Sequence, residues 1–113
     1  MRSHLTILAS LLFACLVQAQ QGARSKGKLF IIGGGDRPPS LMQALVNTSG
    51  LSPNDYVVVL PMSSASPDRA YEYFKADLEP FFRNTIVNFN LTPGRVNDQN
   101  WLDSLQKAKL IFI

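Results

Sequence analysis

The chain has 113 residues, of which 46% are hydrophobic and 17% are charged, and its formal net charge is +3. This length fits one small domain, and the balance of apolar and charged residues excludes an intrinsically disordered chain. The basic residues are scattered singly along the sequence. Without a basic cluster there is no electrostatic footprint for nucleic acid, so a nucleic-acid-binding protein is not expected.

Residues 1–19 have the layout of a secretory signal peptide. A short start with one basic residue (1–4) is followed by the almost purely apolar run 5–17, and Val17-Gln-Ala19 offers small residues for signal peptidase. The apolar run is too short for a comfortable transmembrane helix, so no stable membrane span is predicted. We expect export to the periplasm or the medium, with residues 20–27 as a flexible leader of the mature chain.

Cys15 and His4 are the single cysteine and the single histidine, and both lie within the predicted signal peptide. A lipid anchor on Cys15 is the less favoured alternative, because Phe13 fits a lipobox poorly and the apolar run continues past the cysteine. Cleavage leaves no cysteine and no histidine. That excludes an internal disulfide, a Cys/His zinc site, a cysteine nucleophile and a complete Ser-His-acid triad from these residues.

The stretch Lys28-Leu-Phe-Ile-Ile-Gly-Gly-Gly-Asp36 organises the rest of the chain. Its short apolar run, rich in β-branched and aromatic residues, predicts a buried strand. Three glycines then allow a sharp turn and a close approach of another group. Ligands of open α/β sheets bind outside the carboxyl ends of the strands. We therefore expect the functional edge at Gly33, Gly34, Gly35 and Asp36 and at the ends of the later strands.

Three further strands are predicted, at 56–60, 85–91 and 109–113. The first of these is apolar at every position, as a central parallel strand requires. The polar residues Asn88 and Asn90 alternate in the second, which places it nearer an edge of the sheet.

Three amphipathic helices are predicted between these strands. The first starts at Pro38 and Pro39 and stops at Gly50, and its apolar stripe contains Leu41, Met42, Leu45 and Val46.

The second helix starts after Ser66 as its N-cap and ends near Leu78, ahead of Pro80. Its inward side carries Ala70, Tyr71, Phe74, Leu78, Phe81 and Phe82. Asn97 or Asp98 caps the third helix, with Trp101, Leu102, Leu105 and Ala108 inward.

This alternation predicts an α/β fold with an open, mostly parallel sheet and right-handed crossovers. The last residues of the sequence are highly apolar, which is unusual for a natural terminus. We expect residues 28–113 to be the N-terminal portion of a larger α/β domain, incomplete at its C-terminus.

The glycine run departs from a dinucleotide fingerprint. Pro38 occupies the place of the third glycine, and Pro61 follows Leu60 where an acidic residue is expected. No P-loop is present, so no cofactor is predicted, and a flavodoxin-like cofactor binder is the weakest hypothesis. Asn47-Thr-Ser49 and Asn90-Leu-Thr92 match the glycosylation acceptor pattern.

Taken alone, the candidate site residues have structural explanations. Gly33 to Gly35 predict a tight turn, and Asp36 is more readily a helix N-cap than a catalytic carboxylate. Ser63, Ser64 and Ser66 have no histidine partner, so capping and turn roles are expected for them.

Three segments, 27–36, 57–66 and 109–113, together resemble the start of the cyanophycinase family, peptidase family S51. These are serine peptidases related to dipeptidase E, with a fold similar to class I glutamine amidotransferases. The resemblance covers roughly residues 27–113, and the order and spacing of the segments carry it. It implies an open, flavodoxin-like parallel sheet and hydrolysis of peptide or isopeptide bonds of the β-Asp-Arg type.

The resemblance implies no catalytic residue within these 113 positions. In the family, a Gly-Gly-x-Gln loop, the nucleophile elbow and the base histidine all follow the fourth strand. The same resemblance implies that Gly33 to Asp36, with Pro61, Ser63, Ser64 and Ala65, border the substrate cleft and shape its backbone.

We therefore expect the N-terminal part of a secreted serine hydrolase, inactive by itself, whose partner is a peptide or isopeptide substrate. A secreted, non-catalytic α/β binding module is the alternative. Assembly into a homo-oligomer is left open by the sequence.

Overall fold

The computed structural model describes residues 26–113. The elements follow in the order α2 (Pro39–Ser49), β1 (Val57–Val59), η1 (Pro61–Ser63), α3 (Pro67–Leu78), β2 (Ile86–Asn88), η2 (Pro93–Arg95), α4 (Gln99–Lys107) and β3 (Leu110–Phe112). The three strands form one parallel sheet in the order β2-β1-β3. An α/β fold with an open parallel sheet is thus confirmed. The predicted signal peptide and nearly all of the predicted leader lie outside the described residues.

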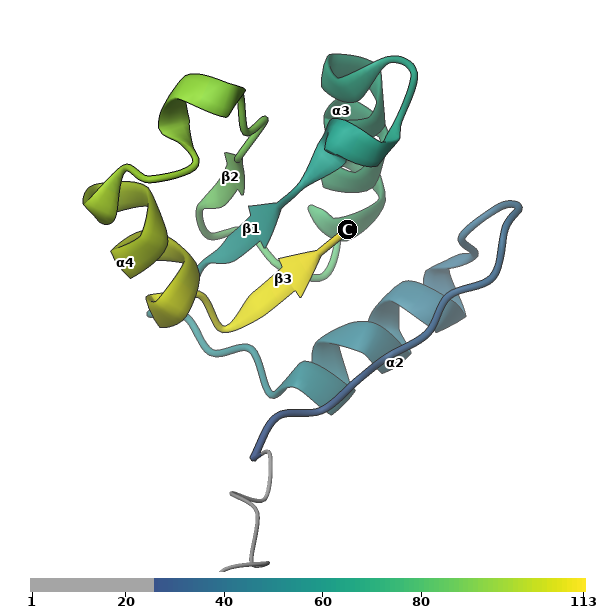
Figure 1. Cartoon of the computed structure of the whole chain (residues 1–113). Helices are drawn as coiled ribbons and strands as arrows, with labels where there is room; N and C mark the ends of the chain where they lie inside the picture. Colours follow the sequence, from purple (N-terminus) through teal and green to yellow (C-terminus); the bar gives the residue numbers. More distant parts are fainter. Residues whose placement is uncertain (1–25) are drawn as a thin grey trace, which may run out of the picture.

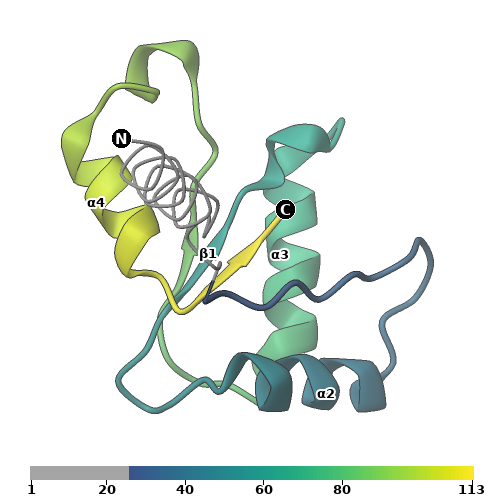
Figure 2. The same ribbon diagram turned by 60° about the horizontal axis from the view of Figure 1, so that its bottom comes forward.

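Helices cover both faces of this sheet, to different extents. On one face lie α2 and α3, and on the other lies α4 (Figures 1 and 2). Val57 and Val59 of β1 belong to the same core cluster as Met42 of α2 and Phe74 of α3. Because side chains alternate along a strand, Val58 belongs to the opposite, α4 face.

The core is the layer between the sheet and the helices α2 and α3. All three valines of β1 are at most 1% exposed, which confirms the central strand predicted from its apolar residues. Phe74 stacks on Phe112 of β3, with ring centroids 3.7 Å apart. The other buried core side chains come from the two helices and the segment after α3, namely Met42, Leu45, Leu78 and Phe82.

Residues close to the helix ends explain where the helices begin and end. Gly50 ends α2 in the left-handed region at φ 65°, and its N–H donates to the carbonyl of Val46, which favours glycine over any residue with a Cβ. Pro39 is the first residue of α2, where its missing N–H is harmless. Asp98 caps α4 by accepting a 3.0 Å hydrogen bond from the N–H of Asn100. These three predictions are confirmed.

Two predicted caps are corrected. Asp36 does not cap α2, because Pro38 occupies the N-cap position and Asp36 lies two residues earlier, where it is exposed. Ser66 is the N-cap residue of α3, as predicted, but its side chain makes no capping hydrogen bond. The helix ends at Leu78, ahead of Pro80, as predicted.

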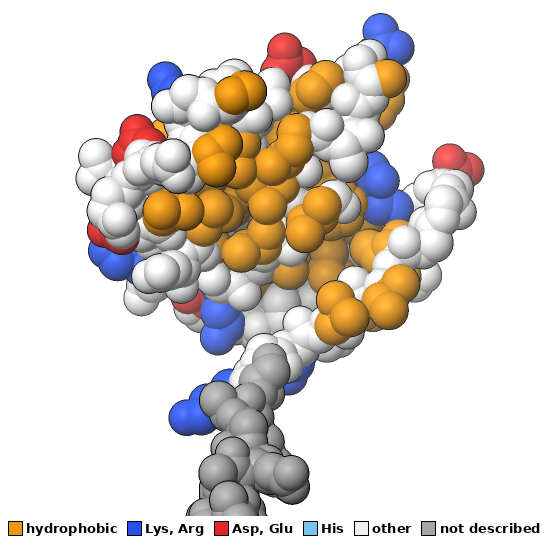
Figure 3. Space-filling view, in the orientation of Figure 1, with side chains coloured by type: hydrophobic (Ala, Val, Ile, Leu, Met, Phe, Trp, Pro, Cys, Tyr) orange, Lys and Arg blue, Asp and Glu red, His pale blue; other side chains and the backbone are white. Residues whose placement is uncertain are grey.

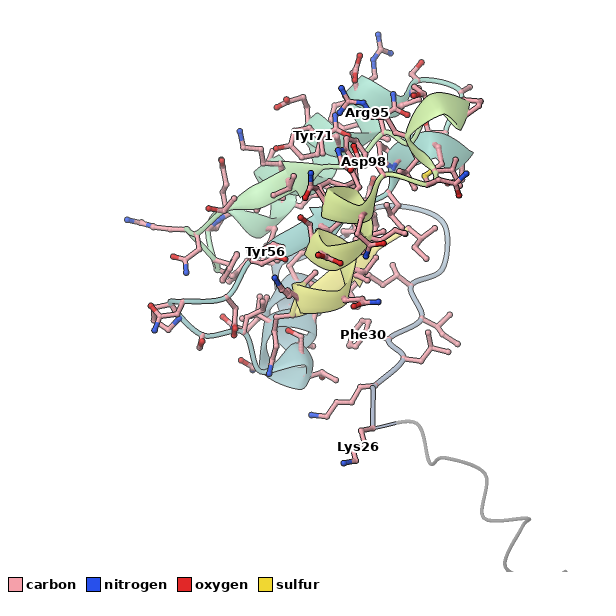
Figure 4. The ribbon with its side chains drawn as sticks, turned by 60° about the vertical axis from the view of Figure 1, so that its left-hand side comes forward. Lys26, Phe30, Tyr56, Tyr71, Arg95 and Asp98 are labelled. Carbon is pink, nitrogen blue, oxygen red and sulfur yellow. The ribbon has the colours of Figure 1, made fainter. Side chains whose placement is uncertain are left out.

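The predicted first strand is wrong in this structure. Residues 28–32, named here the N-terminal strap, are extended but outside the sheet. Phe30 and Ile32 pack against the core cluster, whereas Leu29 and Ile31 are 86% and 82% exposed. The ring of Phe30 extends from the strap toward the folded body (Figure 4). The strap is therefore buried on one side only, through side-chain contacts with the core. Such contacts do not require backbone pairing with a strand.

The α4 face is less covered than its sequence predicts. Leu102, expected to point inward, is 39% exposed, and Ile111 of β3 is 42% exposed. Hydrophobic side chains accordingly form a broad patch on the surface seen in Figure 3. β2 lies at an edge of the sheet, as its alternating polar residues predicted. No helix within residues 26–113 has the length and apolar character needed to cross a membrane.

Candidate functional site

The carboxyl ends of the three strands meet at one edge of the sheet. Beyond the assigned strands, the N–H of Leu60 donates to the carbonyl of Phe112, and the N–H of Phe89 donates to the carbonyl of Val59, both at 2.8 Å. These bonds fix the end of β1 between its neighbours. The chain then continues from β1 directly into η1 and α3, so this loop stands at the edge where α/β sheets bind ligands.

The loop from β1 to α3 contains four of the predicted site residues. Pro61 is buried, Ser64 is half-buried, and Ser63 and Ala65 are exposed. The N–H of Ser64 donates to the carbonyl of Pro61 at 3.0 Å, and the hydroxyl of Ser64 accepts from the N–H of Ser66 at 3.1 Å. The hydroxyl therefore stabilises its own turn, which is the capping and turn role expected from the sequence.

No base stands beside these hydroxyls. Residues 26–113 contain neither histidine nor cysteine, and an unassisted serine hydroxyl is a weak nucleophile. The loop can therefore shape a binding surface, but its serines lack the partner that acyl transfer requires.

The glycine loop lies away from this edge. Gly33, Gly34, Gly35 and Asp36 are all exposed, and a Cβ placed on any of the three glycines would meet no atom within 4 Å. Gly35 has φ 113°, a conformation that favours glycine. In both Figures 1 and 2 this loop stands apart from η1. The structure thus does not bring the two predicted groups of site residues together.

Arg37, directly after the glycine loop, was not singled out by the sequence. Its Nε donates to Oδ2 of Asp77 at 2.8 Å, and a second guanidinium nitrogen lies 2.8 Å from the same oxygen. The guanidinium carbon is 5.9 Å from the ring centroid of Phe74 and 5.8 Å from that of Phe112. Arg37 thereby fastens the end of the glycine loop to α3 and β3. An isolated arginine carries no sequence signal for such a contact.

Asn88 is a second residue whose environment the sequence did not predict. It lies opposite Val59 at the end of β2, and its Oδ1 is buried without a hydrogen-bond partner within residues 26–113. A buried, unpaired amide oxygen is costly in a folded protein. The sequence signal for Asn88 is a polar residue within an apolar strand. That signal predicts a strand near an edge of the sheet, but it does not predict a buried, unpaired oxygen.

A shallow hollow of about 380 Å³ lies at the opposite, amino end of β1 and β2. It is lined by Pro53, Asn54, Asp55, Tyr56, Arg83, Asn84 and Thr85. The amide of Asn84 donates to backbone carbonyls of Pro53 and Asp55, so that this side chain is used to hold the turn.

Asp55 at the rim of this hollow is similarly engaged. The hydroxyl and the N–H of Ser52 both donate to its Oδ2 at 2.8 Å. These hydrogen bonds, and more weakly the charge of Lys109, hold the pKa of the Asp55 carboxyl below its ordinary value of 3.8. The carboxylate therefore serves the turn and is a poor candidate for proton transfer near neutral pH.

Comparison with known proteins found no family model, no curated protein and no solved structure that matches this chain. Within residues 26–113, no three or more His, Cys, Asp and Glu side chains gather in a way that could hold a metal ion. The loop from Pro61 to Ala65 is the best-placed candidate site among the described residues, because it follows β1 at the carboxyl edge of the sheet.

Proposed function

We propose that this chain supplies the N-terminal sheet of an exported, cyanophycinase-like serine hydrolase that cleaves peptide or isopeptide bonds of the β-Asp-Arg type. The observation that carries the proposal is the buried central strand β1, which leads directly into the loop Pro61–Ala65 at the carboxyl edge of a parallel sheet. This is where the family resemblance locates the border of the substrate cleft. The serine nucleophile and its histidine would come from a part of the polypeptide outside these 113 residues.

In this proposal the loop residues shape the cleft and do no chemistry. Pro61 is buried and fixes the exit of β1, while the Ser64 hydroxyl is held by the N–H of Ser66. The exposed Ser63 and Ala65 then present small side chains to a substrate. The exposed Met62 between Pro61 and Ser63 adds an apolar side chain to this surface.

The test is to determine the complete reading frame that contains these residues, express its product and measure release of β-Asp-Arg dipeptides from an Asp-Arg isopeptide polymer. We expect release by the complete product and none by the 113-residue chain. Replacing Ser63 or Ser64 by alanine should leave turnover within about tenfold, since neither has a base beside it. A complete product without a serine-histidine pair, or without hydrolysis of any peptide or isopeptide, would refute the proposal.

One observation favours the non-catalytic alternative, a secreted binding module. Residues 26–113 carry no histidine or cysteine, and a loop such as Pro61–Ala65 needs neither residue in order to bind a ligand. Saturable binding of the Asp-Arg polymer by a complete product that does not cleave it would support this second function over the first.

A further inference from the structure

We propose that Asn47 is the acceptor of an N-linked glycan when the chain is exported through a secretory pathway that holds an oligosaccharyltransferase. Two segments, Asn47-Thr-Ser49 and Asn90-Leu-Thr92, have the acceptor pattern. The pattern does not rank one above the other, whereas their places in the fold do. The inference rests on the export that the proposed function includes, and it does not depend on hydrolysis.

Asn47 lies on the outer side of α2. It is exposed, whereas Met42 and Leu45 of the same helix are 1% and 3% exposed and belong to the core. Because an α-helix turns by about 100° per residue, Asn47 points about 140° or more away from both of these side chains. Its Oδ1 accepts a 3.0 Å hydrogen bond from Nε2 of Gln43, which is itself exposed. A glycan on Asn47 therefore projects into solvent and displaces no core side chain.

Asn47 also lies at the opposite end of the sheet from the candidate site. After α2 the chain passes through Gly50 to the amino end of β1, while the loop Pro61–Ala65 follows the carboxyl end of that strand (Figure 1). A glycan at the end of α2 consequently leaves the candidate loop open to a ligand.

Asn90 has a different environment. It is half-buried and comes directly after Phe89, which is 7% exposed and whose ring lies against Trp101. The N–H of Phe89 donates to the carbonyl of Val59 at 2.8 Å, which places Asn90 at the carboxyl edge of the sheet. A glycan on Asn90 would compete with this packing and stand at the edge that holds the candidate loop.

The two segments also differ in the residue that follows the acceptor hydroxyl. Gly50 follows Ser49, and glycine leaves the backbone free to adopt many conformations. Pro93 follows Thr92, and a residue before proline is held to extended backbone, as Thr92 is at φ −96° and ψ 157°. The segment around Ser49 can therefore adapt to a transferase more readily than the segment around Thr92.

Transfer takes place on the emerging chain, because in folded α2 the Ser49 hydroxyl donates to the carbonyl of Val46 at 2.9 Å. Nδ2 of Asn47 forms a bond to C1 of the sugar of a lipid-diphosphate-linked oligosaccharide. The bond between C1 and the diphosphate oxygen breaks, the lipid diphosphate leaves, and the displaced proton of Nδ2 passes to a base of the transferase. This chain supplies only the acceptor amide and the neighbouring hydroxyl.

The test is to translate the full chain in the presence of microsomal membranes that contain the transferase. We expect a slower-migrating product that peptide-N-glycosidase returns to the mobility of the unmodified chain. The glycosidase converts a glycosylated asparagine into aspartate, so mass spectrometry of the treated product identifies the residue. We expect the occupancy of Asn47 to be at least about fivefold that of Asn90.

Variants of the acceptor segment supply the controls. Ser49→Ala should abolish the modification of Asn47, whereas Ser49→Thr keeps a hydroxyl at this position and should retain it. Asn90→Gln is the matched control at the second segment and should leave the shift in mobility unchanged. Because transfer precedes folding, the result does not require that any of these variants folds.

Two outcomes would overturn the inference. A chain that added protease digests outside the microsomes would refute export, and the inference with it. A protease-protected chain with no glycan on Asn47, or with equal occupancy of Asn47 and Asn90, would refute the choice of Asn47. Hydrolysis of the Asp-Arg polymer is a separate measurement, so failure at Asn47 is distinguishable from failure of the proposed hydrolase.

Discussion

The two faces of the sheet differ sharply in how well they are covered. On the face of α2 and α3, Val57, Val59 and Phe74 are at most 1% exposed. On the face of α4, Leu102 is 39% exposed and Ile111 is 42% exposed. One face therefore has the close packing of a protein core, while the other remains partly open to water.

The difference follows from the number and size of the side chains that each face receives. Two helices contribute Met42, Leu45, Phe74 and Leu78 to the first face, and Phe112 stacks directly on Phe74. The second face receives one helix of nine residues, in which the ring of Trp101 lies against Phe89 with the ring centroids 4.4 Å apart. Burial scales with the apolar area removed from water, so stability should be concentrated on the first face.

Phe74→Ala should cause the largest loss. The ring is fully buried and stacked on Phe112, and truncation of a buried phenylalanine costs about 3–5 kcal/mol of unfolding free energy. Urea denaturation followed by circular dichroism measures this loss. Tyr73→Ala, at a neighbouring position that is 61% exposed, is the control and should cost less than about 0.5 kcal/mol. Similar losses for both variants would contradict the packing described for the first face.

The pair Arg37–Asp77 at the rim of the same face should have an intermediate effect. Because its two side chains are 23% and 36% exposed, solvent screens the pair, and we expect a coupling free energy of about 0.5–1 kcal/mol. A double-mutant cycle with Arg37→Ala and Asp77→Ala measures it. Lys75–Glu79, more exposed and 3.7 Å apart, is the control pair. Coupling that is no greater for Arg37–Asp77 than for this control would refute the proposed fastening.

Leu102→Ala on the open face should change stability by about 0.5 kcal/mol or less, because the side chain is already partly in water and alanine favours the helix. Thermal unfolding is a sufficient measurement. Trp101→Ala on the same helix provides the contrast and should cost clearly more, since it removes the tilted ring contact with Phe89. A large loss for Leu102→Ala would mean that this face is covered after all.

The smallest effect should be the acid dependence at Asp55. Its pKa is lowered in the folded chain by the Ser52 hydrogen bonds, so its contribution to stability is present above the ordinary value of 3.8 and is lost as the pH falls through the folded pKa. Asp55→Asn should therefore be slightly less stable than the parent chain at pH 7 and equally stable at strongly acidic pH. A difference that persists unchanged below pH 3.8 would assign the effect to something other than the charge.

Much of the fold was predictable because its signals are local. The uninterrupted valines of β1, the stop at Gly50 and the cap at Asp98 depend on neighbours along the chain. The strap and Leu102 depend instead on whether another element reaches them. The spacing of apolar residues predicts which face of a helix or strand is apolar. It does not show whether another element covers that face. Both of these predictions failed for that reason.

The candidate site was predictable only in part. The position of the loop Pro61–Ala65 at the carboxyl edge follows from the parallel alternation of strands and helices. Arg37 and Asn88 could not be found in the same way. The partner of Arg37, Asp77, lies 40 residues away in the sequence, and Asn88 is notable only because its Oδ1 is buried without a hydrogen bond. Whether Gly33 to Asp36 belong to the site depends on the tertiary placement of the strap.

Within residues 26–113, β3 pairs with β1 alone, and its other edge bears on how this polypeptide behaves in concentrated solution. Leu110-Ile-Phe-Ile113 is apolar throughout and carries no charge or proline to discourage intermolecular pairing. An uncovered edge of this kind is a template for pairing with a strand of another molecule. A charge on this strand should discourage such pairing, so Ile111→Lys should raise the proportion of monomer measured by size-exclusion chromatography.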